Sequence, residues 1–339
     1  MKNLSVFEKF LYLINSITAF LFLISLIIPY IKPSYLPYFS VLGLFSPLII
    51  SINILFLFFW IAKLKKHFLL SLIVLIIGND SLRSFINFTN NSEYVDENKL
   101  TLISYNVRLF NIYNWINNDN ISDKIQNFLI KENSDVICLQ EYQNFNFSLK
   151  NYPYKYENLR GENLKYGQAI FSKYPIINKG SLRFSSSSNN AIFSDIKINN
   201  DTIRIYNIHL ESFSLEKDLV FSEINSDNDK IFNDLAKTFI SQQDQVYILK
   251  KSISESPHKV VISGDFNNSP YSYIYNELLK NTKDSFKEKG NGFGITFSYN
   301  FIPLRIDFIL VDKKFKVNDF KTFKINFSDH EPIYSEFIY

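Results

Sequence analysis

Hydrophobic residues are concentrated in the first quarter of the chain. Residues 10–31 and 37–62 are almost entirely apolar and carry no charge. Each run is longer than the roughly 20 residues with which an α-helix crosses a bilayer. The first run is too long for the apolar part of a signal peptide, and a second run follows it closely. The pattern therefore predicts a membrane anchor at residues 1–88.

A third apolar run, residues 68–78, decides how often the chain crosses the membrane. Its 11 residues are too few to span alone, and an extension to about residue 88 would pass the polar residues Asn79, Asp80 and Arg83. That extension costs free energy unless these residues lie at the interface. Two and three spans are both open. Three are favoured because 11 uncharged apolar residues after a lysine cluster are costly to leave in water.

Basic residues in short loops indicate the orientation of the anchor. Lysines gather at the N-terminus and in the second loop, at Lys2, Lys9, Lys63, Lys65 and Lys66, whereas the first loop carries only Lys32. The lysine-rich segments should face the cytoplasm. With three spans, everything after about residue 90 lies outside the cytoplasm, and with two spans it lies inside. We expect a multi-pass protein of the inner or plasma membrane with an extracytoplasmic domain.

From residue 99 onward, short apolar runs predict strands and helices in succession. The polar segment 89–98 is typical of a linker, and residues 99–339 should form the soluble domain. Strands are expected at 100–106, 135–140, 168–172, 191–198, 202–208, 259–263 and 306–311. Helices are expected at 122–133, with Ser122 as N-cap, at most of 215–254, and at 271–279. Extended segments should close the chain.

A strand–helix–strand pattern occurs twice in this domain. In the first half the strands end at Asn106 and Glu141, and in the second half they end at His209 and Asp265. Two such units suggest an α/β fold in which two β-sheets pack face to face with helices outside. Polar groups at the strand ends would then meet at one rim, where α/β folds usually place a site.

Overall composition adds little to this interpretation. The net charge of +3 gives no argument for nucleic acid as a partner. The single cysteine, Cys138, lies in an apolar run and is expected to be buried, so cysteine usage does not identify the compartment.

Several strand-end residues have side chains suited to metal and phosphate chemistry. Glu141 directly follows a buried-looking run, where a carboxylate is costly unless it is exposed, paired or bound to a cation such as Mg²⁺. Asp265 near a metal can accept a proton from an attacking water, and the Asn267 amide can hold that water or a phosphate oxygen. A solvated strand end and a plain turn are the alternatives for these two segments.

Histidines and amides supply the remaining candidates. His209 and His330 can donate to a phosphate oxygen whose charge grows in the transition state, and Asp307 can orient a histidine. Asn106 can bind a cation through its carbonyl oxygen or steer a carboxylate. Each of these residues, taken alone, is also compatible with a structural role.

Seven motifs, taken in order, resemble those of the endonuclease/exonuclease/phosphatase family. They are Ser-Tyr-Asn106-Val, Leu-Gln-Glu141, Gly167-Gln-Ala-Ile-Phe-Ser-Lys-Tyr-Pro, Asn207-Ile-His209-Leu, Gly-Asp265-Phe-Asn267, Arg-Ile-Asp307-Phe-Ile and Ser-Asp329-His330. The resemblance covers about residues 100–339. It implies a four-layer α/β sandwich, preceded here by transmembrane helices, and hydrolysis of phosphoesters that depends on Mg²⁺ or Mn²⁺.

The resemblance also implies roles for individual residues. Glu141 would be the main metal ligand, aided by Asn106, and Asp329 would reach a second metal position. Asp265 would position or deprotonate the attacking water, and Asn267 would hold the phosphate. The phosphoryl oxygens would be stabilised by His209 and His330, the latter oriented by Asp307. Arg108 departs from the usual motif and is a candidate substrate contact, as is Tyr166 beside Gly167.

These expectations describe a membrane-anchored, metal-dependent hydrolase, with a phosphodiesterase or nuclease favoured. A sphingomyelinase-like phospholipid phosphodiesterase and a phosphomonoesterase are the alternatives, so the substrate is a nucleic acid or a lipid head group. The bilayer is the other expected partner, and no protein partner is implied. A catalytically silent binding module would need a broken set of site residues. A transport or sensing role for the spans would need buried charge, which they nearly lack.

Overall fold

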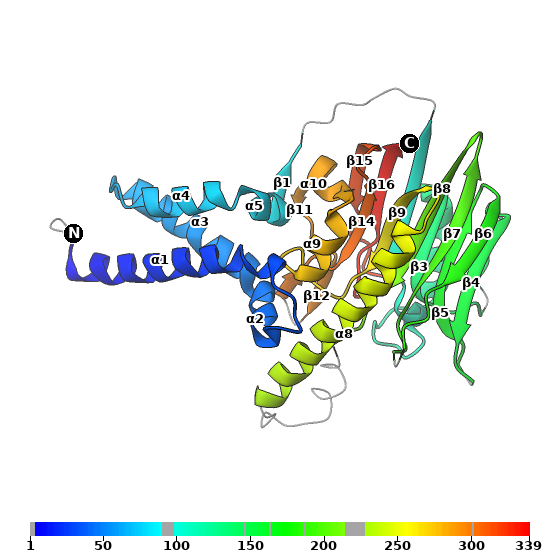
Figure 1. The fold of residues 1–339 in the computed structure, drawn as a ribbon, viewed down its shortest axis with the longest axis horizontal. Coiled ribbons are helices and arrows are strands. Elements are labelled where there is room, and N and C mark those ends of the chain that lie inside the picture. The colour runs from blue at the N-terminus through cyan, green and yellow to red at the C-terminus, as the bar shows by residue number, and fades with distance from the viewer. Residues whose placement is uncertain are drawn as a thin grey trace.

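The N-terminal apolar segments form a helical bundle that projects from one side of a β-sandwich (Figure 1). A computed structural model describes residues 4–89, 98–145, 147–162, 164–185, 187–213, 228–299 and 302–339. The bundle comprises α1 (Val6–Ser25), η1 (Ile28–Tyr30), α2 (Pro37–Val41), η2 (Leu42–Phe45), α3 (Ser46–Ala62), α4 (Phe68–Ile77) and α5 (Asn79–Phe85). Two stretches, Val6–Tyr30 and Pro37–Ala62, are long and apolar enough to cross a membrane.

The third apolar run does not form one straight helix. Helices α4 and α5 meet at Gly78 with a bend of 85°. The ten residues of α4 rise only about 15 Å. Gly78 nevertheless lies against Phe22 and Leu26, which are at the end of α1 nearest the sheets. Helix α4 therefore runs back along the bundle toward the sheets.

Polar side chains join the three long helices inside the bundle. The Asn15 amide of α1 donates to Ser71 Oγ of α4 at 2.7 Å and accepts from Trp60 Nε1 of α3 at 3.0 Å. All three residues are fully buried. Hydrogen bonds between apolar helices specify which faces pack together, so this bundle has a defined arrangement.

Two six-stranded mixed sheets form the rest of the structure. The first contains, in spatial order, β15 (Lys316–Thr322), β16 (Ile333–Ile338), β2 (Lys99–Asn106), β3 (Val136–Tyr142), β5 (Tyr166–Ser172) and β4 (Tyr154–Arg160). The second contains β10 (Thr282–Asp284), β14 (Asp307–Asp312), β9 (Lys259–Asp265), β8 (Asp201–His209), β7 (Asn190–Ile198) and β6 (Ile176–Ser181). Only the pairs β2–β3 and β8–β9 are parallel.

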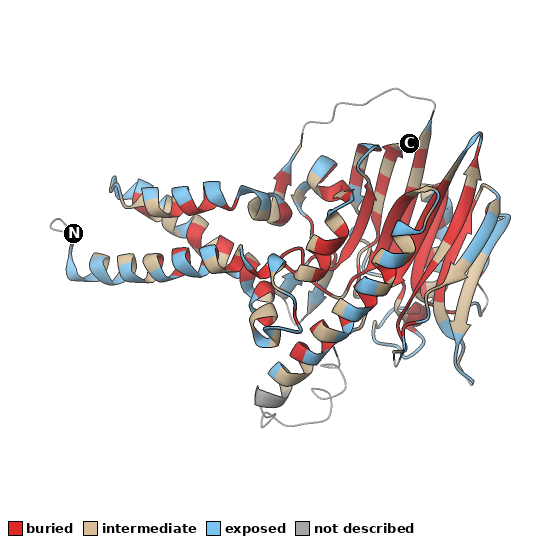
Figure 2. Ribbon diagram, viewed as in Figure 1, coloured by how far each residue is buried: buried red, intermediate tan, exposed pale blue. Residues whose placement is uncertain are grey.

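The sheets pack face to face and helices cover their outer faces, which confirms the predicted four-layer sandwich. Leu102 and Cys138 of the first sheet share a buried cluster with Ile205 and Val261 of the second. Helix α6 (Ile121–Glu132) covers the first sheet, and α8 (Asn228–Ser254) and α9 (Tyr273–Leu279) cover the second. Figure 2 shows the buried strands between these helical layers.

Some predicted elements need correction. Ser122 is not an N-cap, because α6 follows Asn120, which adopts the left-handed conformation (φ +57°) that asparagine tolerates. Helix α9 starts at Tyr273, capped by Ser272, so residue 271 precedes it. The edge strands β4 and β6 were not predicted, because both lack a buried apolar run and consist of exposed or half-buried residues.

Parts of two predictions lie outside the described residues. They are residues 90–97 of the expected linker and residues 215–227 of the expected long helix. Smaller elements complete the described chain: η3 (Arg108–Asn111), α10 (Ser285–Lys289), and the strand pairs β1 (Ile86–Phe88) with β11 (Asn291–Phe293) and β12 (Phe297–Tyr299) with β13 (Ile302–Leu304).

Candidate active site at the strand ends

The candidate site consists largely of side chains that lie at the strand ends on the inner faces of the two sheets. Side chains two residues apart share a face, so the buried residues Leu100 and Leu102 place Asn106 on the inner face of β2. By the same rule, Ile203 and Ile205 lead to His209 on β8. Asp265 follows Val261 on β9, and Asp307 shares a face with Ile309 on β14. His209 and Asp307 are both direct register partners of Asp265.

Glu141 reaches the same place only because its strand is irregular. Alternation along β3 would turn Glu141 outward, because Cys138 and its inner-face neighbours occupy the even positions. The register shifts between Leu139 and Tyr142, and Glu141 has φ +48°. Such a bulge redirects a side chain, and the Glu141 carboxylate lies 3.9 Å from His209 Nε2.

Asn106 joins the two carboxylates. Its amide Nδ2 donates to Glu141 Oε1 at 3.2 Å and to Asp265 Oδ2 at 3.0 Å. Its Oδ1 accepts from the backbone N–H of Arg108 at 3.1 Å. The amide thus steers both acids in this arrangement, whereas binding a cation through Oδ1 would require the opposite amide orientation.

Two histidines flank Asp265. His330 Nδ1 and Asp307 Oδ2 are hydrogen-bonded at 2.9 Å, and His330 Nε2 lies 3.6 Å from Asp265 Oδ2. His209 Nε2 lies 3.7 Å from the same oxygen. The Asp307 backbone is held by Thr296, whose Oγ1 accepts its N–H at 3.1 Å. His330 is therefore oriented by one carboxylate and directed at another.

The environment moves the pKa of these groups in different directions. Burial, together with the nearby charge of Asp307, raises the pKa of Asp265 to about 6. Burial also raises the pKa of Glu141 and lowers that of His209. For His330 burial acts to lower the pKa, but the negative charges of Asp307 and Asp265 outweigh it, so its pKa lies well above the usual value. The site therefore favours a protonated His330 beside a neutral His209.

Asn267 lies on the tight loop after β9. Phe266 is fully buried, and Asn267 has φ +48°. The Asn267 backbone N–H donates to Asp265 Oδ1 at 2.8 Å, and its side-chain Nδ2 donates to the Leu210 carbonyl at 3.0 Å. The side-chain amide is thus engaged with the end of β8, at the edge of the site.

Arg108 and Asp329 pair with each other across the entrance. Arg108 Nη1 lies 3.1 Å from Asp329 Oδ2, and its guanidinium lies 4.4 Å from the ring centroid of Trp115. Residues 108–111 all have positive φ, which costs free energy for residues other than glycine. This left-handed turn places Arg108 against Asp329 and Trp115. The Asp329 carboxylate faces Arg108 here.

Tyr166 lies in the same groove as two site residues. A groove of about 240 Å³ is lined by Glu141 and His209, and also by Tyr113, Trp115 and Tyr166. All three aromatic residues are exposed. The structure thus brings Tyr166 to the candidate site.

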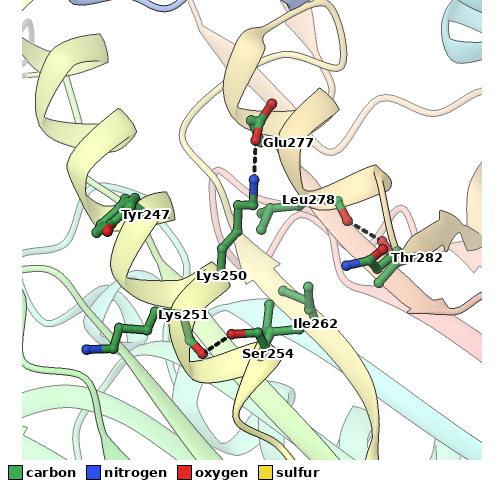
Figure 3. Close-up of a pocket in the computed structure, with 10 residues that line it drawn as sticks. Tyr247, Lys250, Lys251, Ser254, Ile262, Glu277, Leu278 and Thr282 are labelled. Atoms are coloured by element: carbon green, nitrogen blue, oxygen red, sulfur yellow. Dashed lines mark hydrogen bonds and ion pairs between the residues drawn. The ribbon is translucent and has the colours of Figure 1, made fainter.

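A larger hollow, of about 390 Å³, lies between α8 and α9 (Figure 3). Two of its charged lining residues, Lys250 and Glu277, form an ion pair with each other. It contains none of the strand-end residues. Size alone therefore does not identify the site in this molecule.

Two neighbouring groups of residues could hold a cation. Asp265, Asp307 and His330 offer ligand atoms within 4.8 Å of one another, yet their mutual contacts already satisfy them. Glu141 keeps 30% of its side chain exposed in the groove. Carboxylate, amide and substrate oxygens suit Mg²⁺ or Mn²⁺ better than a set of ligands that contains imidazole. The position at Glu141 therefore fits a divalent cation better than the group of Asp265, Asp307 and His330 does.

Three polar residues of the sequence motifs, to which the motifs assign no role, connect the two sheets below the site. Gln140 Nε2 donates to Asn207 Oδ1 at 2.7 Å, and Asn207 Nδ2 donates to the Leu139 and Ala169 carbonyls at 2.9 Å. Gln168 Nε2 donates to the Asn207 carbonyl at 2.9 Å. The available signal in the sequence was the position of these polar residues near strand ends, on faces that point inward.

Replacing Asp307 by Asn should move the alkaline limb of the pH–rate profile to lower pH. A protonated His330 persists up to its raised pKa, so activity that needs the imidazolium is present below that pKa and lost above it. Removing the Asp307 charge lowers the pKa of His330, and the limb should shift down by roughly one to two units. Asp312→Asn, at the other end of β14, is the control. An unmoved limb in Asp307→Asn would contradict the assignment.

Comparisons with known proteins identify the family of the sandwich. Residues 103–330 match the model of the Endonuclease/Exonuclease/phosphatase family, and residues 8–85 match a domain of unknown function. No curated protein matches the chain.

Solved structures share the fold at low identity. Truncated Caenorhabditis elegans TDP2 is 17% identical with a TM-score of 0.53, and the match covers 71% of this chain and 98% of that one. D. rerio TDP2 complexed with single strand DNA product is 17% identical (TM-score 0.51; 71% and 99% covered). A family protein from Leptotrichia buccalis is 16% identical (0.52; 71% and 100%). Because the family model spans more than half of the sequence, this chain belongs to the endonuclease/exonuclease/phosphatase family.

Proposed function

We propose that this protein is a membrane-anchored, metal-dependent hydrolase of phosphate diesters. The observation that carries the proposal is the convergence of Glu141, Asp265 and His330, with Asn106 and His209, at one end of the two sheets. Acids, imidazoles and amides in one groove are what phosphoester hydrolysis requires, because charge develops on oxygen atoms that need donors.

Each side chain has a defined task in this proposal. Asp265 positions a water and accepts its proton, for which a pKa of about 6 is well suited near neutral pH. His330, held protonated by Asp307, donates to a phosphoryl oxygen. His209 faces Asp265 from the other side and contributes a second imidazole. Asn267 holds the phosphate after its side-chain amide releases the Leu210 carbonyl and donates to the substrate instead.

Glu141 would hold the divalent cation, and Asn106 keeps its carboxylate in place. A bound Mg²⁺ or Mn²⁺ polarises a phosphoryl oxygen and stabilises the leaving oxygen. Asp329 becomes available for a second cation only if its ion pair with Arg108 opens. Opening this pair would also free the Arg108 guanidinium for a substrate phosphate.

Single-stranded nucleic acid is the favoured substrate class. The aromatic residues Tyr113, Trp115 and Tyr166 line the groove beside Glu141, and stacking of a base on such a ring contributes about 1–3 kcal/mol. The structure of D. rerio TDP2 with a single strand DNA product shares the fold, which supports the proposal. A phospholipid head group is the competing substrate, favoured by the apolar bundle.

The enzyme class and the substrate are tested in one series of assays. The full chain in detergent should hydrolyse bis-p-nitrophenyl phosphate with Mg²⁺ or Mn²⁺ and lose this activity in EDTA. Rates are then compared on single-stranded DNA, RNA and phospholipid vesicles. Higher activity on vesicles would replace the nucleic-acid proposal, and inactivity on every phosphoester with either metal would overturn the hydrolase proposal.

We further propose three membrane passages with the sandwich outside the cytoplasm. The sandwich contacts the loop between the first two apolar helices: Asn276 Nδ2 donates to the Pro29 carbonyl at 3.0 Å, and the Ser34 N–H donates to Gln243 Oε1 at 3.0 Å. The turn between α3 and α4, with its lysines, lies at the far end of the bundle (Figure 1). If both long helices cross the membrane, these two ends lie on opposite sides, and the lysine-rich end faces the cytoplasm.

Single cysteines should report this topology. Ile177→Cys on β6 is expected to react with a membrane-impermeant maleimide in intact cells, whereas Leu64→Cys in the α3–α4 turn should react only after lysis. Both positions are well exposed, at 57% and 93%. The native Cys138 is fully buried, so the parent protein is a low-background control. The reverse labelling pattern would place the sandwich in the cytoplasm.

A further inference from the structure

The loop that carries Asp265 and Asn267 continues directly into the membrane bundle. Tyr271, six residues after Asp265, is only 3% exposed and belongs to the buried cluster of the bundle. The other buried members come from α1, α3 and α4; they are Ala19, Phe22, Ile50, Val74 and Leu75. A residue of the sandwich is thus part of the core of the bundle.

The backbone of the bundle approaches this loop closely. Ser269 Oγ donates to the Gly43 carbonyl at 3.4 Å. A Cβ atom at Gly43 would lie 3.1 Å from the Tyr271 carbonyl oxygen, tighter than most real contacts of this kind. The small residue at position 43 therefore permits the loop to lie directly on η2.

A second connection runs through α8. Gln242 is fully buried, and its Nε2 donates to the carbonyls of Glu211 at 2.7 Å and Asn267 at 3.1 Å. Its Oε1 accepts from Asn268 Nδ2 at 2.6 Å. The preceding turn of α8 packs on the bundle, because Phe239 shares a buried cluster with Val41 of α2. The same helix thus touches the bundle and holds the backbone of the loop.

We propose that the membrane bundle positions the active-site loop, with Tyr271 and Gln242 as positioning residues and Gly43 as the contact point. Asn267 holds a left-handed conformation (φ +48°), which persists only when surrounding contacts determine it. Gln242 of α8 holds the Asn267 carbonyl, and the bundle holds the same loop a few residues later, at Ser269 and Tyr271. The bundle therefore does more than tether the domain. For its kinetic readout, this inference rests on the proposed hydrolase function.

Tyr271 offers a matched pair of variants. Its hydroxyl has no hydrogen-bond partner among the described residues, so Tyr271→Phe should behave as the parent protein. Tyr271→Ala removes the ring from the bundle and should lower kcat by at least about tenfold, because small displacements of a catalytic group are costly. The KM should change less than kcat, since Asn267 is the one residue proposed to bind substrate on this loop and the groove is lined by other segments.

Hydrogen exchange supplies a readout that does not depend on activity. In Tyr271→Ala, amides of residues 264–272 should exchange faster, while those of β3 and β8 keep the parent rate. If Tyr271→Ala fails to fold, Gly43→Val replaces it in the experiment. The added side chain presses on the loop from the bundle side and should accelerate the exchange of the same amides. Ser16→Val is the control, because it adds bulk to another part of the bundle, on α1.

The two readouts separate the two proposals. Faster exchange of residues 264–272 without activity on any phosphoester would retain the positioning role and reject the hydrolase. A folded Tyr271→Ala with unchanged exchange and unchanged kcat would overturn the positioning role. Equal acceleration by Ser16→Val would also overturn it, because the effect would then be general loosening of the bundle.

Discussion

Asp265→Asn should lower kcat by about 10²–10⁴-fold, the usual contribution of a positioned general base. The substitution keeps the shape of the side chain and its contact with the Asn267 N–H, but removes the negative charge that faces His330 and His209. The asparagine amide cannot accept the proton of a water. Rates on bis-p-nitrophenyl phosphate at saturating metal would measure the loss.

The stability of this variant should not follow its activity. Burial raises the pKa of Asp265, so the charged carboxylate is held at a cost in folding free energy. Asp265→Asn should therefore melt within a few degrees of the parent or above it. Asp319→Asn, on the edge strand β15 beside Lys321, is the control and should retain full activity. Retention of full activity by Asp265→Asn as well would remove Asp265 from the mechanism.

Glu141→Gln should raise the Mg²⁺ concentration needed for half-maximal activity by at least about tenfold, because a neutral amide is a much weaker ligand for a hard cation than a carboxylate. The change keeps the side-chain volume and leaves an oxygen to accept from Asn106. Metal titrations of activity, together with Mn²⁺ binding measured on the full chain in detergent, would report the effect. Excess metal should restore part of the rate.

The same titration distinguishes the two candidate cation sites. Glu157→Gln on β4 is the control, since this carboxylate accepts from the Tyr142 hydroxyl at 2.9 Å outside the site. If Glu141→Gln binds metal normally and Asp307→Asn does not, the cation belongs to the group of Asp265, Asp307 and His330. In that case Glu141 would line the groove without binding the cation.

The N-terminal bundle constrains how the activity of this protein should be measured. The sandwich contacts the bundle near the candidate active-site loop, through Tyr271, Ser269 and the α8 residue Phe239. A strand contributed from beyond α5, β1, also pairs with β11. Removing the N-terminal helices would expose the ring of Tyr271, and a truncation that also removes β1 would leave β11 unpaired. Kinetic work should therefore use the full chain.

Much of the architecture was predictable because it depends on local periodicity. Runs of alternating apolar residues marked the central strands, such as residues 100–106 and 202–208, and the same alternation put Asn106, His209 and Asp265 on inward faces. The apolar runs marked the bundle helices. The edge strands β4 and β6 were not predicted, because solvent tolerates any polar residue and therefore imposes no pattern on exposed strands.

The sequence by itself determined which strand ends carry the candidate chemistry and which segments are apolar enough for a membrane, since both follow from the order of side chains. Only the tertiary structure decided that Glu141 turns inward at a bulge, that Asn106 donates to two acids, and that Tyr271 is buried in the bundle. These features depend on contacts between residues far apart along the chain. Local pattern carries no record of such contacts, because they form only when the sheets and the helices pack together.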